Sequence, residues 1–423
     1  MNSALTEAVQ VSIRPGEMAD TYYYGDTNVE KQAYPCVENN RFQQTFQNLG
    51  QGTSQFVISA NQGMSDMVVR MRMPTSIPND CSGTAFNEGW AYSLIRQVSV
   101  RYGSSAQYFF TGDQVLLEAL HDCENGSKRD QLIALGGNAI TGVEVEGALG
   151  YVYLKLPHNS PRAQGKPLPF PTDLLVQPVV ITIELRALRD IAVPVAGAGS
   201  PADLTGLQLA EATLQVKQEM MEDSADLLAR RVDMNTHAYT FPLPYFPQQQ
   251  VDIRCAGGGA QSVNLTGFRA GEVQKILLWL NKASDLSGNG LNYAPWNFQP
   301  ITDIQLTYNG EIFFRADALA SQIWSLVEQE KEAAVNTQVW TAGGSGSVAT
   351  GLDSPLATWV EIPFAQTNPG YDRESKLVHG KPILNAVVNL QFTCPDASDY
   401  VLHAVYLYNA SVLCSRGSAE YIF

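Results

Sequence analysis

The sequence predicts an all-β protein built from two tandem β-sandwich domains with a few short accessory helices. Three observations support this prediction. Apolar and polar residues alternate with a period of two in many short segments, clusters of Gly, Pro and Asn separate these segments, and one pattern of features occurs twice, about 200 residues apart. Such a sequence is typical of β-sandwiches, in which each strand turns one face to a core and the other to solvent.

The alternation is clear where the apolar residues Val98, Val100 and Tyr102 are interleaved with polar residues. Side chains in a strand point alternately to opposite faces, so this spacing places the three apolar residues on one face. The same alternation predicts further strands at residues 143–146, 152–156, 181–185, 304–308, 388–392 and 400–408.

Three segments carry helical signals instead. Residues 113–121 and 317–334 each begin with Asp, which suits a helix N-cap. Residues 222–231, EDSADLLARR, begin acidic and end basic, as the helix dipole favours. We expect these short helices to be accessories to the sheets.

An internal repeat divides the chain. In the first half, a strand leads to a Phe-Phe pair and then to the helical segment at Asp113, and the second half repeats this order up to Asp317. Each half continues with a strand that ends in Pro, a loop, a Gly-Lys-Pro tripeptide and another strand. The shared order of these features indicates two copies of one fold of about 200 residues.

The repeat defines an N-terminal arm, residues 1–40, followed by two domains, residues 41–228 and 229–423. The arm has no sustained period and no counterpart before the second repeat. Tyrosines offer a large contact area at a modest entropy cost, so we expect those of the arm to contact neighbouring subunits, a further protein or a membrane-facing surface during assembly. They are Tyr22, Tyr23, Tyr24 and Tyr34.

The composition favours protein contacts over nucleic-acid contacts. The chain has 27 Lys and Arg against 42 Asp and Glu, a net charge of −15, so we expect no direct binding to nucleic-acid phosphates. Only 16% of residues are charged, while 29 Gln and 23 Asn supply neutral polar surface. Such groups cost less to desolvate than ions, which suits a protein that buries much of its surface in assembly.

The cysteines suit a reducing compartment, and the apolar segments predict neither a secretion signal nor a membrane span. Six cysteines lie far apart without a CxxC pair, as expected for free thiols. We expect no secretion signal, because the first residues lack a basic segment followed by an apolar one. The most apolar stretch, residues 174–188, contains polar residues and is shorter than the roughly 20 residues of a membrane span.

Several segments resemble one viral family. Residues 87–120, NEGWAYSLIRQVSVRYGSSAQYFFTGDQVLLEAL, and residues 150–186, which contain KLP and the strand VVITIEL, are similar to segments of the double jelly-roll major capsid proteins of nucleocytoplasmic large DNA viruses, virophages and polinton-like viruses. Residues 212–231 and 273–282 are similar to later strands of that family. Residues 268–272, FRAGE, depart from it, because the family has an aromatic-His-Pro turn there.

The resemblance implies a function in assembly. It implies a fold of two tandem eight-stranded jelly rolls, and a homotrimer whose six rolls form a pseudo-hexagonal capsomer of an icosahedral shell. The implied partners are neighbouring capsomers, penton proteins and minor capsid proteins, with an inner membrane as a further candidate. The implied location is the virion, after assembly in the cytoplasm or in a viral factory of the host cell.

Few residues indicate catalysis. The five histidines form no HxH or HExxH motif, so we predict no metal site, no cofactor and no catalytic residues. His121, Asp122 and Cys123 could join a thiol to a base, but the end of a helix explains them better. Glu144 and Glu146 could form a carboxylate pair for glycoside hydrolysis, but a solvated strand face is the simpler interpretation.

Glycan attachment and an alternative function complete the hypotheses. Asn-x-Ser/Thr triplets make Asn125 and Asn264 candidate glycan acceptors, and Asn409, which follows an apolar strand, the least favourable one. The alternative to a capsid protein is a tandem jelly-roll carbohydrate-binding protein or glycan-active enzyme. Size in solution separates the two, because the alternative is compatible with a monomer.

Overall fold

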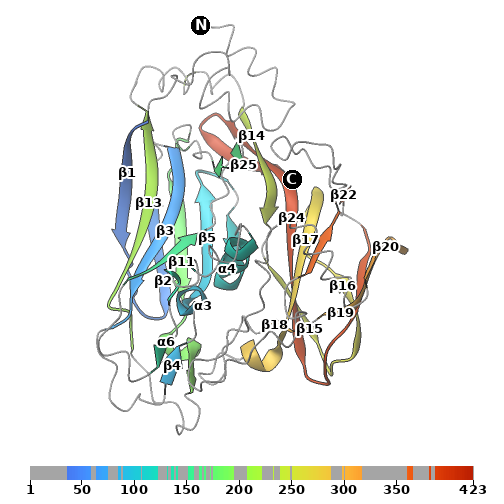
Figure 1. Cartoon of the computed structure of the whole chain (residues 1–423). Coiled ribbons are helices and arrows are strands. Elements are labelled where there is room, and N and C mark those ends of the chain that lie inside the picture. The colour runs from blue at the N-terminus through green and yellow to red at the C-terminus, as the bar shows by residue number, and fades with distance from the viewer. Residues whose placement is uncertain are drawn as a thin grey trace.

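The computed structural model contains two β-sandwiches that lie next to each other (Figure 1). Strands make up most of the described chain, as the alternation of apolar and polar residues predicts. The structure describes residues 36–58, 63–74, 84–86, 89–105, 107–121, 131, 135–137, 140–141, 151–156, 162–163, 166–167, 172, 175–194, 207–221, 232, 239–247, 250–286, 298–299, 301–316, 360–364, 381–382 and 386–422.

The first sandwich consists of two four-stranded antiparallel sheets. One sheet is ordered β1 (Cys36–Thr45), β13 (Glu211–Met221), β3 (Gly63–Arg72), β8 (Val152–Leu156). The other is ordered β2 (Gly52–Ile58), β11 (Val179–Leu185), β5 (Ile95–Tyr102), β6 (Tyr108–Phe110). Strand β1 begins within the segment assigned to the arm, because residues from Cys36 onward pair with β13.

The second sandwich has a larger and a smaller sheet. The larger one follows the path β14 (Tyr239–Pro247), β24 (Tyr400–Ser415), β17 (Glu272–Lys282), β18 (Phe298–Gln299). Additional strands pair with β24, namely β15 (Val251–Cys255) and β25 (Ser418–Ile422), or with β17, namely β21 (Val360–Pro363) and β22 (Lys381–Pro382). The smaller sheet is ordered β16 (Ala260–Leu265), β23 (Val388–Thr393), β19 (Thr302–Tyr308), β20 (Glu311–Ala316).

Both sandwiches have the same strand order. The sheet β2-β11-β5-β6 corresponds to β16-β23-β19-β20, and β1-β13-β3-β8 corresponds to β14-β24-β17-β21. If the eight main strands of each sandwich are numbered along the chain, its sheets are ordered 1-8-3-6 and 2-7-4-5. This is the connectivity of a jelly roll. The chain is a double jelly roll, and the repeat predicted from the sequence is confirmed.

Short elements connect the main strands. A small sheet is formed by β4 (Thr84–Phe86), β7 (Ile140–Thr141) and β12 (Ala192–Pro194), and a hairpin by β9 (Arg162–Ala163) and β10 (Lys166–Pro167). The described helices are α3 (Trp90–Leu94), α4 (Gly112–His121), α6 (Leu188–Ile191) and the 3-10 helix η4 (Ala283–Leu286). Helix α4 confirms the prediction for residues 113–121. The predicted elements at 143–146, 222–231 and 317–334 lie outside the described residues.

Helix α4 begins at a glycine because the backbone of α3 passes close to it. A Cβ atom on Gly112 would lie 2.0 Å from the carbonyl oxygen of Tyr92 and 2.5 Å from that of Ile95. Those carbonyl groups belong to a buried backbone that cannot shift without breaking the helix packing. The glycine therefore fixes α4 next to α3, with Val115 and Leu116 buried in the core of the first roll.

Three cysteines whose side chains the structure describes are buried thiols. Cys255, Cys394 and Cys414 are free and are at most 3% exposed. Burial raises the pKa of Cys255, and burial together with the nearby Cys255 and Asp396 raises the pKa of Cys394 to about 12. Because the thiolate is the reactive form, both properties protect these groups from electrophiles.

We predict that Cys255 and Cys394 react with iodoacetamide at least about a hundredfold more slowly in the native protein than in denaturant. Mass spectrometry of tryptic peptides after timed alkylation measures both rates. Equal rates in the two conditions would contradict the buried positions of these thiols.

Candidate functional site at the junction of the two jelly rolls

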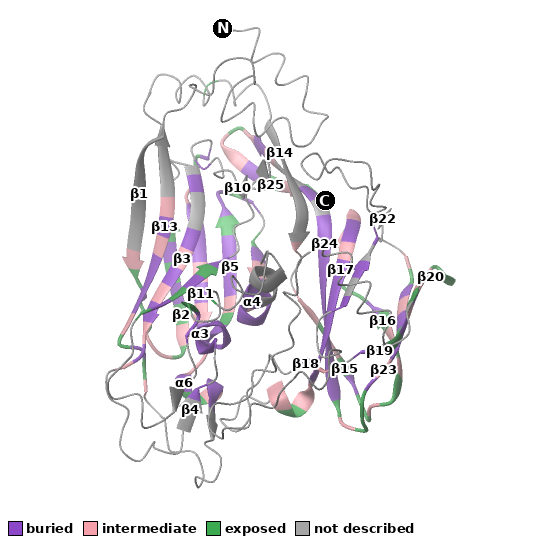
Figure 2. Cartoon of the chain, viewed as in Figure 1, coloured by how far each residue is buried: buried purple, intermediate pink, exposed green. Residues whose placement is uncertain are grey.

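Strands β17 and β24 form the wall between the two rolls, and residues on both of their faces are buried (Figure 2). On β17, Leu278 and Leu280 pack in the core of the second roll, while Leu277 and Trp279 join the core of the first. Strand β24 divides in the same way, and its residues that join the first core include Val405 and Leu407. The two rolls therefore share a continuous apolar contact.

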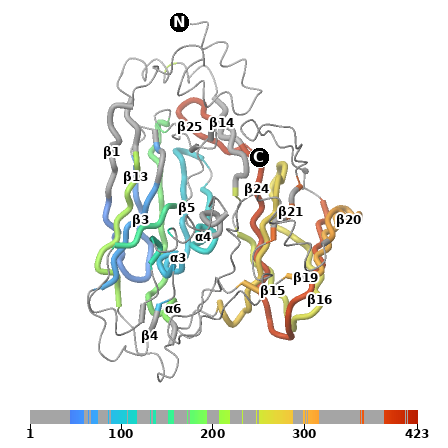
Figure 3. Tube along the Cα trace, viewed as in Figure 1, coloured from blue at the N-terminus to red at the C-terminus, as the bar shows by residue number. Residues whose placement is uncertain are grey.

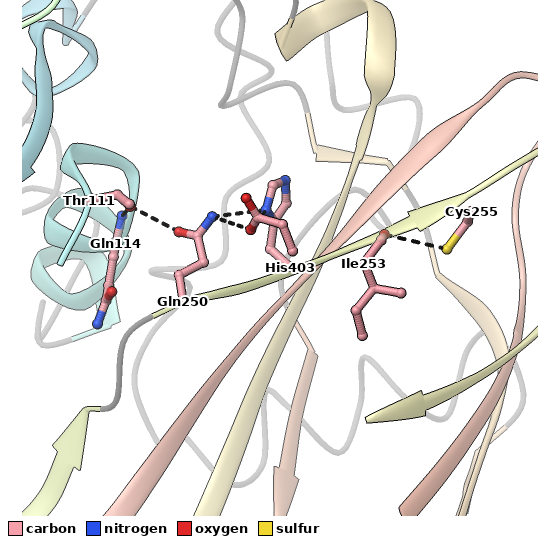
Figure 4. Close-up of polar contacts among 7 residues, drawn as sticks. Thr111, Gln114, Gln250, Ile253, Cys255 and His403 are labelled. Atoms are coloured by element: carbon pink, nitrogen blue, oxygen red, sulfur yellow. Dashed lines mark hydrogen bonds and ion pairs between the residues drawn. The ribbon is translucent and has the colours of Figure 1, made fainter. Parts of the chain in front are cut away.

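A series of hydrogen-bonded polar side chains crosses this junction (Figure 4). Thr111 lies just before α4, and its hydroxyl oxygen accepts a hydrogen bond from the backbone N–H of Gln114 at 3.1 Å, as an N-cap does. The same hydroxyl donates to the Oε1 atom of Gln250 at 2.9 Å. Gln250 precedes β15, so this contact joins the start of α4 in the first roll to the second roll.

This series of hydrogen bonds continues to a buried histidine. The Nε2 atom of Gln250 donates to the Oδ1 atom of Asp252 at 2.7 Å, and the Nδ1 atom of His403 lies 2.7 Å from the same oxygen. A carboxylate accepts hydrogen bonds, so the ring proton of His403 is on Nδ1. The imidazole is 3% exposed and stacks on Trp279 with 5.1 Å between ring centroids. The series of hydrogen bonds thus ends among the aromatic residues of β17 and β24.

The histidine favours the ionised carboxylate. Partial desolvation raises the pKa of Asp252, but the hydrogen bond from His403, the electrostatic interaction with that ring and the hydrogen bond from the Gln250 amide together lower it by more, so the pKa lies below the usual range. No described residue hydrogen-bonds the Nε2 atom of His403. Within the described residues, Asp252 and His403 connect β15 and β24 to the start of α4 through Gln250.

We predict that Asp252 makes the stability depend on acid pH. A carboxyl whose pKa is lower in the folded than in the unfolded chain stabilises the fold above about pH 4, and this contribution is lost as pH falls through the folded pKa. Asp252→Asn should lower the free energy of unfolding at neutral pH by up to about 1 kcal/mol and should flatten its decline toward acid pH. Urea unfolding across this range measures both effects, with Glu420→Gln at an exposed site as the control. An unchanged pH profile in Asp252→Asn would contradict the link.

The C-terminal hairpin binds the second roll to the first. Strand β24 continues beyond the second roll and pairs with β25, and Figure 3 shows this red segment reaching the first roll. The ring of Tyr421 on β25 lies 6.3 Å from that of Tyr102 and 5.7 Å from that of Tyr108. The Val176 backbone N–H also donates to the Gly417 carbonyl oxygen at 2.8 Å. The hairpin therefore completes the core of a domain that lies far earlier in the sequence.

The outward face formed by β16 and β23 is neutral. Neither β16 nor β23 contains a charged residue. The Nδ2 atom of Asn389 donates to the Oγ atom of Ser262 at 3.1 Å and to the Oδ1 atom of Asn264 at 3.0 Å. Ile312 and Val387 are 59% and 63% exposed. Desolvating such a face costs less than desolvating ions, which suits contact with another protein surface.

The structure places two of the residues singled out from the sequence in strands and describes the side chain of one of them. Asn264 is exposed on β16, where a glycan acceptor must be, although its side chain is bonded to Asn389. Asn409 lies in β24. The other singled-out residues lie outside the described residues or have side chains that are not described, namely Tyr22, Tyr23, Tyr24, Tyr34, His121, Asp122, Cys123, Asn125, Glu144 and Glu146.

The sequence analysis missed the junction residues Thr111, Gln250, Asp252 and His403. The available signal was the single histidine in the otherwise apolar run YVLHAVYLY, which begins at residue 400. Among the described residues, no group of three or more His, Cys, Asp and Glu side chains is arranged to hold a metal ion. In the same part of the chain, no helix has the length and apolar character needed to cross a membrane.

Comparison with known proteins gives matches in structure only. No protein-family model and no curated protein sequence matches the chain. The capsid model of PBCV-1 virus matches with a TM-score of 0.59 at 13% identity, over 91% of this chain and 97% of the other. The fold is that of viral major capsid proteins. It is the fold that the resemblance of residues 87–120 and 150–186 implied.

Two further structures match over nearly the whole chain. The Faustovirus major capsid protein has a TM-score of 0.53 at 11% identity, over 98% of each chain. The mavirus major capsid protein has a TM-score of 0.51 at 9% identity, over 95% of this chain and 94% of the other. The capsid-protein fold therefore includes both rolls and the junction between them.

Proposed function

We propose that this chain is a major capsid protein of a double-stranded DNA virus of the large DNA virus, virophage and polinton-like group. The observation that carries the proposal is the presence of two jelly rolls of identical strand order in one chain, with a fold shared with viral major capsid proteins across more than nine tenths of its length. The protein acts by self-assembly, without a catalytic residue or a cofactor.

Three copies form the building block. Three copies of a two-roll chain present six rolls, which give a nearly hexagonal outline that tiles an icosahedral facet. Two described features support large contacts between copies. The face of β16 and β23 is free of charged residues, and the shared apolar junction holds the two rolls of one chain in a fixed relation.

The remaining assignments follow from this function. Residues 41–228 and 229–423 are the two assembly domains, and the arm contacts other subunits through Tyr22, Tyr23, Tyr24 and Tyr34. The partners are neighbouring capsomers, penton proteins, minor capsid proteins and an inner membrane, in a virion assembled in the cytoplasm or a viral factory. Asn125 and Asn264 are the proposed glycan acceptors on the particle surface.

We predict a compact trimer in solution. Light scattering of the purified full chain at micromolar concentration should give three times the chain mass of 46.2 kDa, and electron microscopy should show three-fold particles. A stable monomer would contradict the proposed function and favour the carbohydrate-binding alternative.

Deletion of residues 1–35, which precede β1, should leave the trimer intact and impair the formation of shells, because an unduplicated segment is not needed to close a jelly roll.

A further inference from the structure

The contact between the two rolls of one chain joins two different surfaces (Figure 1). The first roll contributes the side formed by β6 and α4, where Thr111 hydrogen-bonds Gln250. The second roll contributes the outward face of the sheet β14-β24-β17-β21, whose apolar residues in the first core include Leu277, Trp279, Val405 and Leu407. A contact between unlike surfaces is head-to-tail, and head-to-tail contacts between similar units close into rings when the rotation allows it.

The duplication places a second surface of each kind at the two far sides of the molecule (Figure 1). By strand order, β1-β13-β3-β8 is the counterpart of β14-β24-β17-β21, and β16-β23-β19-β20 is the counterpart of the sheet that ends in β6. We call the outward residues of the first of these sheets the head face; they include Val68, Arg70, Tyr151, Glu211, Thr213 and Gln215. We call the outward residues of the sheet β16-β23-β19-β20 the tail face; they include Ser262, Asn264, Gln305, Ile312, Asn389 and Gln391.

The strand register aligns the two large sheets residue by residue. Leu156 on β8 pairs with Met67, and Ile362 on β21 pairs with Ile276; Leu156 and Ile362 are both followed by Pro in the sequence. Met67 and Ile276 are therefore equivalent positions, and each is buried in the core of its own roll. The neighbouring strands β13 and β24 are aligned by the same register.

The alignment shows that polar residues of the head face stand where the second roll has apolar contacts. Outward positions alternate with buried ones along each strand, so they can be counted from Met67 and Ile276. The equivalent pairs, with the second-roll residue first, are Leu277 and Val68, Trp279 and Arg70, His403 and Thr213, and Val405 and Gln215. The face of the second roll is mainly aliphatic and aromatic, whereas the head face has a guanidinium, a hydroxyl and an amide group beside one valine.

The head face is ordered by contacts of its own. Arg70 forms an ion pair with Glu211, and its guanidinium carbon lies 4.3 Å from the centroid of the Tyr151 ring. The hydroxyl of Tyr151 donates to the Oε2 atom of Glu211 at 2.7 Å. Large apolar patches that stay exposed favour aggregation, so the apolar face of β17 and β24 has to be covered as the chain folds. The head face, in contrast, is compatible with exposure to water in a folded single chain.

The tail face is chemically compatible with the head face. The Nδ2 atom of Asn389 donates to Ser262 and to Asn264, so this face is also ordered by its own contacts. Strands β16 and β23 contain no charged residue, so contact with Arg70 brings no like charges together there. Amide and hydroxyl oxygens of the tail face are acceptors for guanidinium N–H groups. A second copy of the chain is therefore a fitting partner, and polar surfaces of this kind are typical of contacts between chains that fold separately.

We propose that the head face of one copy packs on the tail face of the next, and that three such contacts join chains that have already folded into the trimer. This inference rests on the proposed capsid function and names the contact by which its trimer closes. The contact repeats between copies the relation that the two rolls have within one chain, so all six rolls follow one another around a ring. The apolar contact within the chain forms with folding, and the polar contact between copies forms afterwards.

Photocross-linking tests which surfaces meet. Ile312, which is 59% exposed at the edge of the tail face, is replaced in the full chain by p-benzoylphenylalanine, and purified trimers are irradiated. A denaturing gel should show cross-linked dimers, and mass spectrometry should find position 312 joined to peptides that contain β3 or β13. Dimers in which position 312 is joined to any other segment, or trimers that give no cross-linked dimer, overturn the proposal.

Single charges test whether the contact is separable from folding. Gln391→Lys adds a charge to the exposed tail face, and Val68→Asp adds one to the head face at the position equivalent to Leu277. Each variant should lower the trimer fraction at micromolar concentration at least about tenfold and keep the circular dichroism spectrum of the intact chain. The matched control is Ala256→Lys, at an exposed position between β15 and β16, which should leave the trimer fraction unchanged. Trimers that persist in Gln391→Lys, or loss of its folded spectrum, overturn the proposal.

The contact and the proposed function fail in different ways. Intact trimers that cross-link elsewhere from position 312, or that persist in Gln391→Lys, overturn the contact alone. An intact chain that forms no trimer overturns the proposed function, and the contact with it.

Discussion

Replacing Leu278 with aspartate should prevent the second jelly roll from folding. The Leu278 side chain is fully buried in the core of that roll. Loss of its packing and burial of a carboxyl group there cost about 5 kcal/mol or more in total. This equals much of the stability of a typical domain, about 5–15 kcal/mol. Hydrogen exchange followed by mass spectrometry should show that β16, β19 and β23 lose their protection.

The neighbouring residue provides the control. Leu277 is equally buried, but it faces the first roll across the junction. Leu277→Asp should therefore disrupt the contact between the rolls while β16, β19 and β23 keep their protection from exchange. Small-angle X-ray scattering should then show a larger radius of gyration. Loss of protection in those three strands for both variants would contradict the division of β17 between two cores.

Replacing Tyr421 with alanine should destabilise the first roll, although Tyr421 lies in the last described strand. Its ring contacts Tyr102 and Tyr108, which stack on each other with 6.1 Å between centroids. Removal of a fully buried aromatic side chain costs about 3–5 kcal/mol, and Tyr421 is partly buried against the first core, so we expect a loss of about 2–3 kcal/mol. Urea unfolding followed by tyrosine fluorescence and circular dichroism should show this loss as a lower midpoint of the transition.

Two substitutions control for this effect. Tyr421→Phe keeps the ring in the aromatic cluster and should retain most of the stability. Tyr153→Ala removes a tyrosine of the same size from the exposed face of β8 and should change the free energy of unfolding by less than about 1 kcal/mol. If Tyr421→Ala behaves like Tyr153→Ala, the hairpin does not contribute to the first core.

The duplicated architecture could be predicted from the sequence because its signals are local. Strand β8 alternates strictly, with Val152 and Leu154 buried and Tyr153 exposed, since one face meets a core and the other meets solvent. Helix α4 is marked in the sequence by Asp113, which lies in its first turn, although the residue that caps the helix is Thr111. The repeated order of such features identified two copies of one fold, although the jelly-roll connectivity itself entered through the family resemblance.

The junction could not be predicted in this way. Strands β17 and β24 are apolar on both faces, so their sequences show little alternation and do not reveal that the two faces serve different cores. Thr111 and Gln250 are 139 positions apart, and Asp252 and His403 are 151 apart, so only the folded chain brings them together.

The aromatic contact of Tyr421 also sets a time order in synthesis. A ribosome makes the first roll first, at about 5–20 residues per second, so Tyr102 and Tyr108 wait roughly 15–60 s for Tyr421. During this interval the nascent first roll lacks the aromatic contacts that Tyr421 supplies. Chains released before Tyr421 is added keep that gap. The core of the first domain therefore depends on a segment that is translated about 300 residues later.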